Sequence, residues 1–147
     1  MSTPVLFSHA EATALLSLVR EVFARVRPLR AQLVAEAKEL SALGIDPFRL
    51  RPVGPEGLTE ELARRRQALH ELSERVDTEL AELSSLGLEV KSAEGLVDFR
   101  SLHEGRIVLL CWEWDEQDIS HWHELETGYA GRQPVQDATA FLGEEAH

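Results

Sequence analysis

Two long stretches of apolar residues at helical spacing, separated by a segment rich in proline and glycine, constrain the fold of this chain most strongly. The first stretch predicts a helix over residues 8–43. Ser8 is expected to cap this helix, with Glu11 completing a capping box. Pro28 should kink the helix or split it in two, because proline lacks a backbone donor. Gly44 then supplies a left-handed stop.

The second stretch predicts a helix over residues 59–86, capped by Thr59. The segment between the helices, residues 44–57, contains three prolines and three glycines and predicts a loop. Because this loop is short, the two helices should pair antiparallel as a hairpin. The apolar stripe of the second helix consists of Leu62, Leu69, Leu72, Val76, Leu80, Leu83 and Leu86. Such stripes need a partner, which is either a second copy of the chain or the sheet that follows.

After the second helix the apolar period changes from helical to extended, which predicts a β-sheet over residues 88–124. The expected strands are 88–91, 96–99, 106–112 and 118–124. Their connections are short, so a four-stranded antiparallel meander is the simplest topology. Residues 125–147 form a glycine-rich loop and a tail. The fold class is therefore α+β, with residues 1–147 as one domain, the size expected for 147 residues.

Composition narrows the classes of function. The net charge of −11 argues against binding to nucleic acid or to an anionic membrane. Nine acidic residues and one arginine lie between Cys111 and His147, a formal charge of −8. No apolar run is long enough to cross a bilayer, and no secretory signal is visible. A single cysteine excludes an intrachain disulfide, so we expect a cytoplasmic protein.

An ordered set of short motifs resembles an uncharacterised bacterial family, domain of unknown function 2203 (DUF2203). The motifs are Gly95-Leu-Val-Asp-Phe99, Leu110-Cys-Trp112, Glu116, Trp122-His-Glu124, Gly128 and Arg132-Gln-Pro134, together with the helix start Phe7-Ser-His-Ala-Glu-Ala12. The resemblance covers most of the chain. It implies no activity, because the function of the family is unknown. This chain departs from the expected pattern at Trp114-Asp115, in the turn before Glu116.

Soft and hard metal ligands concentrate between residues 98 and 124. In a hairpin with a five-residue loop, Cys111 faces His121 across the strands, and His123 lies on the same side. One cysteine and two histidines can hold zinc or another divalent transition metal, with a carboxylate or water as fourth ligand. Glu116 or Glu124 would then carry protons. The alternative is a buried core thiol beside histidines that are hydrogen-bonded to carboxylates, and a one-residue register shift would separate Cys111 from His121.

Other residues of this region have both a binding and a structural interpretation. Cys111 could be a nucleophile, although the apolar run before it favours an inert thiol. Trp112 and Trp122 could flank a ligand or close the sheet against the helices. Arg132 could clamp an anion or could pair with Glu116 or Glu124. Asp98, which is polar within an apolar strand, could line a ligand site, and its expected partner is Lys91 or Arg106.

Three functions follow from these patterns. The first is a non-enzymatic interaction or scaffold protein that forms a homodimer through its helical hairpin. The second is a metal-binding protein or metal-dependent enzyme that uses Cys111, His121 and His123. The third rests on outline alone: a helical hairpin joined to a β domain resembles regulators that probe the secondary channel of RNA polymerase, with Asp46 and Glu56 near the tip.

Overall fold

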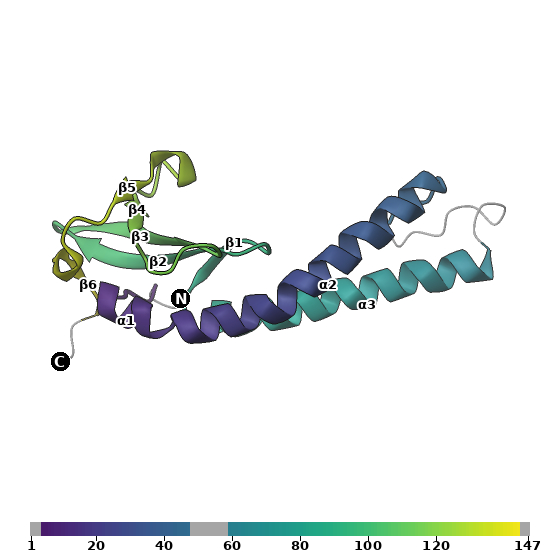
Figure 1. Ribbon diagram of the computed structural model, residues 1–147, viewed down its shortest axis with the longest axis horizontal. Coiled ribbons are helices and arrows are strands. Elements are labelled where there is room, and N and C mark those ends of the chain that lie inside the picture. Colours follow the sequence, from purple (N-terminus) through teal and green to yellow (C-terminus); the bar gives the residue numbers. More distant parts are fainter. Residues whose placement is uncertain (1–3, 48–58, 145–147) are drawn as a thin grey trace.

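The computed structural model describes residues 4–47 and 59–144, and it has two parts: a long helical hairpin and an antiparallel sheet packed against one end of that hairpin (Figure 1). This is the α+β architecture expected from the sequence. Most of the loop predicted between the helices, including Glu56, lies outside the described residues. Within the described ranges, no helix is both long enough and apolar enough to span a membrane.

The first helical stretch is divided near its start. α1 (His9–Ala14) begins with the predicted capping box: the Ser8 hydroxyl accepts from the Glu11 amide at 3.0 Å, and the Glu11 carboxylate accepts from the Ser8 amide at 2.9 Å. The helix is interrupted at Leu15, and α2 (Leu16–Ala42) continues from there. The capping box fixes where the chain enters the helical region.

α2 remains helical through Pro28, so the predicted split does not occur there. Side chains on both sides of Pro28 are held by a turn at residues 93–95. Arg27 donates to the backbone carbonyl of Glu94, and Arg30 pairs with the Glu94 carboxylate at 2.8 Å. These contacts and the buried Val26 offset the one backbone hydrogen bond that proline removes.

α3 (Glu60–Ser85) returns antiparallel to α2, as the short connection predicted (Figure 1). Its first turn is capped by the Thr59 hydroxyl, which accepts from the Leu62 amide at 3.2 Å. Ion pairs such as Arg25 with Glu79, at 2.7 Å, join the two helices on the exposed side. Such exposed pairs set the alignment of the helices more than their stability.

The sheet contains the predicted four-stranded meander and two further short strands. The strands are β1 (Glu89–Ser92), β2 (Leu96–His103), β3 (Arg106–Glu113), β4 (His121–His123), β5 (Gln133–Pro134) and β6 (Phe141–Leu142). Strands β1 to β5 are neighbours in that order, and β6 pairs with β2 at the end that β1 leaves free. All pairs are antiparallel. The two additional strands come from the segment predicted as loop and tail, which also holds two 3-10 turns, η1 (Tyr129–Gly131) and η2 (Ala138–Ala140).

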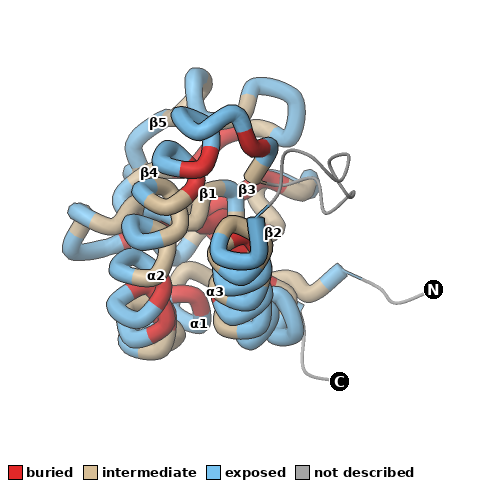
Figure 2. Tube along the Cα trace, turned by 90° about the vertical axis from the view of Figure 1, so that its right-hand side faces the viewer, coloured by how far each residue is buried: buried red, intermediate tan, exposed pale blue. Residues whose placement is uncertain are grey.

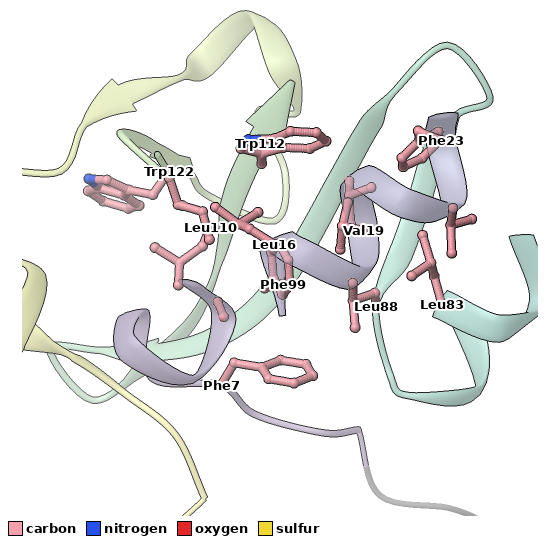
Figure 3. Close-up of a cluster of buried hydrophobic side chains, with 14 of the residues drawn as sticks. Phe7, Leu16, Val19, Phe23, Leu83, Leu88, Phe99, Leu110, Trp112 and Trp122 are labelled. Carbon is pink, nitrogen blue, oxygen red and sulfur yellow. The ribbon is translucent and has the colours of Figure 1, made fainter. Parts of the chain in front are cut away.

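The main core lies between the helices and one face of the sheet (Figure 3). Val19 and Phe23 of α2 pack against Phe99 and Trp112 of the sheet, and all four side chains are fully buried. Phe7, in front of α1, meets Phe99 edge to face, with ring centroids 5.6 Å apart. This layer fixes which face of each strand points away from the helices.

The distal half of the hairpin extends beyond the sheet and has a small core of its own, formed by Ala37, Leu40, Ile45 and Leu69 (Figure 1). Viewed along the hairpin, the outward side of α3 is exposed (Figure 2). Leu69 and Val76, from the stripe expected to need a partner, are buried within the chain, at 2% and 7% exposed. The apolar stripe is therefore covered largely without a second copy.

Candidate functional site

The face of the sheet that points away from the helices carries a group of polar residues brought together by strand register. Asp98 on β2 pairs with Cys111 on β3, and Cys111 pairs with His121 on β4. His123 lies two residues further along β4 and shares its face. The predicted register of Cys111 against His121 is therefore confirmed.

Asp98, Cys111 and His123 converge on one point. One ligand atom from each residue lies within 4.8 Å of the other two, and the side chains are buried, at 2%, 1% and 3% exposed. Among the described residues, these three are the histidine, cysteine and acidic side chains that lie close enough together to hold one ion. Two ligand atoms of a tetrahedral zinc ion lie about 3.4–3.7 Å apart, so small side-chain rotations would close the geometry.

The hydrogen bonds of His123 define what its ring offers to this point. Nδ1 lies 2.8 Å from the carbonyl oxygen of Glu124, and because a carbonyl only accepts, Nδ1 carries the hydrogen. In a neutral ring, Nε2 is then an acceptor, yet it faces Oδ2 of Asp98 at 3.1 Å. Two acceptors at this distance require a proton or a cation between them. A backbone carbonyl on one nitrogen and an ion on the other is the usual arrangement of a metal-bound histidine.

Asp98 and Cys111 are held in an environment that disfavours their charged forms. Burial raises the pKa of Asp98 above its ordinary value, against the opposing effects of His123 and Lys91. Oδ1 of Asp98 has no hydrogen-bond partner within the described part of the chain. Burial, together with the Asp98 carboxylate, also raises the pKa of the Cys111 thiol to about 12. Without a bound cation this thiol is therefore protonated at neutral pH, which disfavours Cys111 as a free nucleophile.

His121 is not part of this group, although the sequence placed it with Cys111 and His123. Its Nδ1 lies 2.9 Å from the Ser120 hydroxyl and 3.3 Å from the Glu116 carboxylate, and its side chain is 36% exposed. His121 is the first residue of β4, directly after the turn that contains Glu116. Its ring therefore contacts that turn. Asp98 occupies the third position of the buried group.

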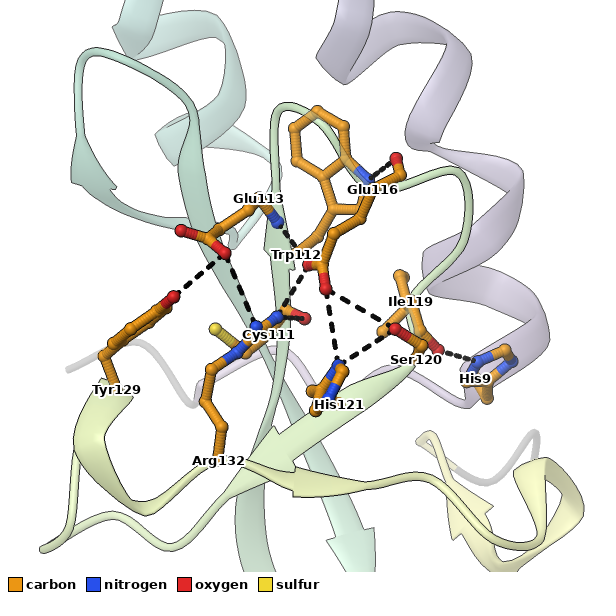
Figure 4. Close-up of polar contacts among 10 residues, drawn as sticks. All are labelled: His9, Cys111, Trp112, Glu113, Glu116, Ile119, Ser120, His121, Tyr129 and Arg132. Atoms are coloured by element: carbon orange, nitrogen blue, oxygen red, sulfur yellow. Dashed lines mark hydrogen bonds and ion pairs between the residues drawn. The ribbon is translucent and has the colours of Figure 1, made fainter.

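Arg132 fastens the segment after β4 to the turn before it (Figure 4). Its guanidinium donates to the Glu116 carboxylate at 2.6 Å and to the carbonyl oxygen of Cys111 at 3.1 Å. Glu116 in turn accepts from the amide of Glu113 at 2.8 Å. The structural partner predicted for Arg132 is thus Glu116. Its positive charge also lies close enough to Cys111 to lower the pKa of the thiol, although burial outweighs that effect.

The remaining residues singled out by the sequence lie away from the buried group. Trp112 is fully buried in the core, and its indole donates to the carbonyl of Glu116 at 2.9 Å. Trp122 packs on Phe141 with ring centroids 5.8 Å apart. Glu124 pairs with Arg106 on the exposed surface. These side chains shape and brace the sheet.

A pocket of about 240 Å³ opens directly onto the buried group. Besides Asp98, Cys111 and His123, its walls are formed by Lys91, Leu96, Leu109, Leu125, Gly128 and Tyr129. Leu125 and Tyr129 are 48% and 50% exposed, among the largest exposures of any apolar side chain in the described ranges. The phenol of Tyr129 donates to the Glu113 carboxylate at 3.0 Å. The candidate proton carriers Glu116 and Glu124 do not line this pocket.

The sequence contained a signal for the role of Asp98 but not for the walls of the pocket. An acid between two buried apolar residues, opposite a cysteine in the expected hairpin, marks a buried polar pair. By contrast, Leu125 and Tyr129 lie in an irregular segment. Such a segment has no helical or strand periodicity from which the direction of a side chain can be predicted. Their place at the pocket follows from β5, which the sequence did not predict.

The chain belongs to the family described as uncharacterized conserved protein (DUF2203), whose model matches residues 5–135. The match spans both the hairpin and the sheet, and it includes every residue of the buried group and of the pocket. Searches of curated proteins and of solved structures found no match. The family membership confirms the resemblance drawn from the motifs, and the description of the family assigns no function.

Proposed function

We propose that this protein binds a divalent transition metal ion, zinc foremost, through Sγ of Cys111, Nε2 of His123 and the carboxylate of Asp98. The observation that carries the proposal is the contact between Nε2 of His123 and Oδ2 of Asp98. With its ring hydrogen on Nδ1, His123 turns the lone pair of Nε2 toward Oδ2 of Asp98 at 3.1 Å, and both side chains are almost fully buried. A cation can take the place of a proton between them, and it would also give a partner to Oδ1 of Asp98, which has none among the described residues.

The mixture of ligand atoms favours zinc or a neighbouring transition metal over calcium and magnesium. Thiolate and imidazole are soft or intermediate ligands, whereas calcium and magnesium prefer shells of oxygen atoms. Three protein ligands leave one tetrahedral position free, as in zinc sites that bind a further molecule. The pocket that Asp98, Cys111 and His123 line would supply the space for such a molecule.

Surrounding residues suit a metal-bound thiolate. The carbonyl of Glu124 fixes the His123 ring by accepting from Nδ1. The guanidinium of Arg132 provides positive charge near Cys111 and favours the thiolate. Such outer groups orient ligands and typically change metal affinity by about 10–100-fold when removed.

The test is metal content of untagged protein loaded with zinc and then passed through gel filtration. We expect about one zinc per chain in the unaltered protein and a loss of zinc in His123→Ala and Cys111→Ser, while His121→Ala, the matched control on the same strand, retains it. Circular dichroism should show that all three variants fold. Metal-free protein, or equal losses in His121→Ala and His123→Ala, would refute the site.

A second candidate function is self-association through the distal half of the hairpin. A hollow there is lined by Ala68 and Leu72, by the ion pair of Glu36 with Arg65, and by the oppositely charged side chains of Glu71 and Arg75. A surface of mixed charge around an apolar centre complements itself under two-fold symmetry. Light scattering should then give twice the chain mass, and Ala68→Glu, an exposed substitution, should return it to one chain mass. A single chain mass for the unaltered protein would exclude this role.

A further inference from the structure

The pocket beside the proposed metal site has a chemistry that indicates what it binds. Its polar end is formed by the proposed metal ligands and by Lys91, which lines the same pocket. Its other walls include Leu96, Leu109 and Leu125. The polar end and the apolar walls meet in one small space.

The balance of charge at the polar end favours a single negative charge. A divalent ion is neutralised by one thiolate and one carboxylate. Of the charged side chains in the pocket wall, Lys91 is the one outside the proposed ligand group. Its partner Glu89, at 2.9 Å, is itself paired with Arg100 at 2.6 Å. A monoanion at the open metal position would balance the charge of Lys91.

The size and walls of the pocket limit the rest of the molecule. A volume of about 240 Å³ corresponds to roughly eight water molecules, which accommodates a ligand of roughly six to eight heavy atoms. Leu125 and Tyr129 expose apolar surface at its rim. Apolar surface at the opening of a pocket can contact the apolar part of a bound molecule.

We propose that the pocket takes a small monoanion with a short aliphatic tail, such as a four-carbon carboxylate. Its anionic group occupies the open metal position beside Lys91, and its tail lies against the leucines of the pocket. This inference rests on the proposed metal site. It assigns the ligand class of that site without specifying whether the bound molecule is sensed, carried or converted.

The experiment uses the full chain loaded with cobalt(II), whose visible absorption reports changes at the metal. Butyrate, acetate, butanol and butylammonium are titrated in turn. We expect butyrate to shift the spectrum saturably, and acetate to bind about tenfold more weakly because it lacks two methylene groups. Butanol and butylammonium should leave the spectrum unchanged. An equal response to butylammonium and butyrate, or no response to butyrate, would overturn the ligand class.

Two variants separate the contributions to binding. Lys91→Gln should keep one cobalt per chain but weaken butyrate binding about tenfold, since a charged hydrogen-bond partner is lost. Lys38→Gln, an exposed lysine on α2, is the matched control and should change neither quantity. Unaltered butyrate affinity in Lys91→Gln would contradict the inference alone. Failure of the unaltered protein to bind cobalt would remove the metal site and the inference together.

Discussion

The two faces of the sheet use neighbouring residues for opposite purposes. Val97, on the helix side of β2, lies in the core with apolar neighbours. Asp98, the next residue, is also buried, on the other face, and one of its carboxylate oxygens has no hydrogen-bond partner in residues 4–47 and 59–144. Trp112 and Cys111 on β3 repeat the contrast. Burying a polar group without a partner costs about 1–3 kcal/mol. The helix side therefore stabilises the fold, and the outer side retains groups that cost stability without a bound cation.

The helix side should show the largest effect on stability. Phe99→Ala removes a fully buried ring that packs against Phe7, so we expect a loss of about 3–5 kcal/mol in the free energy of unfolding. Urea unfolding in the presence of a chelator measures it. Zinc affinity in the fraction that remains folded should be unchanged. A loss below about 1 kcal/mol would show that this face is not the main core.

The outer side should respond to metal instead. Free zinc at about 100 times its dissociation constant should raise the free energy of unfolding by about 2.7 kcal/mol. This gain should be absent in His123→Ala and present in His121→Ala, because only His123 lies in the buried group. Urea unfolding with and without zinc provides the comparison. Equal stabilisation of both variants would place the ion elsewhere.

A substitution of Asp98 should show how much the buried acid on the outer face lowers the free energy of unfolding. Because burial raises the pKa of Asp98, there is a pH range above 3.8 in which the folded chain holds a proton that the unfolded chain has released. The acid therefore destabilises the metal-free fold increasingly as pH rises above the ordinary pKa of 3.8, and contributes nothing below it. Asp98→Asn should raise metal-free stability by about 1 kcal/mol at pH 7 and lose zinc binding. Unfolding curves from pH 3.5 to 8, with chelator, test this, and a variant less stable at pH 7 would contradict it.

The smallest effect is expected where neither face is involved. Arg106, the first residue of β3, pairs with Glu124 on the exposed surface. Arg106→Gln should change neither the free energy of unfolding nor zinc affinity measurably, because exposed ion pairs contribute little. Calorimetric titration with zinc and urea unfolding serve as the check. A marked loss of zinc affinity would mean that this pair supports the site through β4.

The fold followed from the sequence wherever one periodic pattern dominated. The helix caps at Ser8 and Thr59 were predicted because a capping residue and the apolar stripe after it agree. The break at Leu15 was not, since a helical stripe continues through that residue without any local signal. Strands β5 and β6 are two residues each, which is too short for a period to be recognised.

The site followed only in part, for a physical reason. Strand register could be inferred from loop length, and it placed Cys111 opposite His121. Which side chain turns inward is decided by tertiary partners: the Glu116 carboxylate and the Ser120 hydroxyl hold His121 outward, and the Glu124 carbonyl turns His123 toward Asp98. These partners depend on backbone geometry in turns, which a residue pattern does not specify.

X-ray absorption at the zinc edge of the loaded protein tests the central claim most directly. The arrangement of Asp98, Cys111 and His123 predicts one sulfur at about 2.3 Å and nitrogen or oxygen neighbours at about 2.0–2.2 Å. The sulfur signal should persist in His121→Ala, whereas Cys111→Ser, which loses zinc, should retain no zinc to measure after gel filtration. A shell of nitrogen and oxygen alone in the unaltered protein would contradict the account.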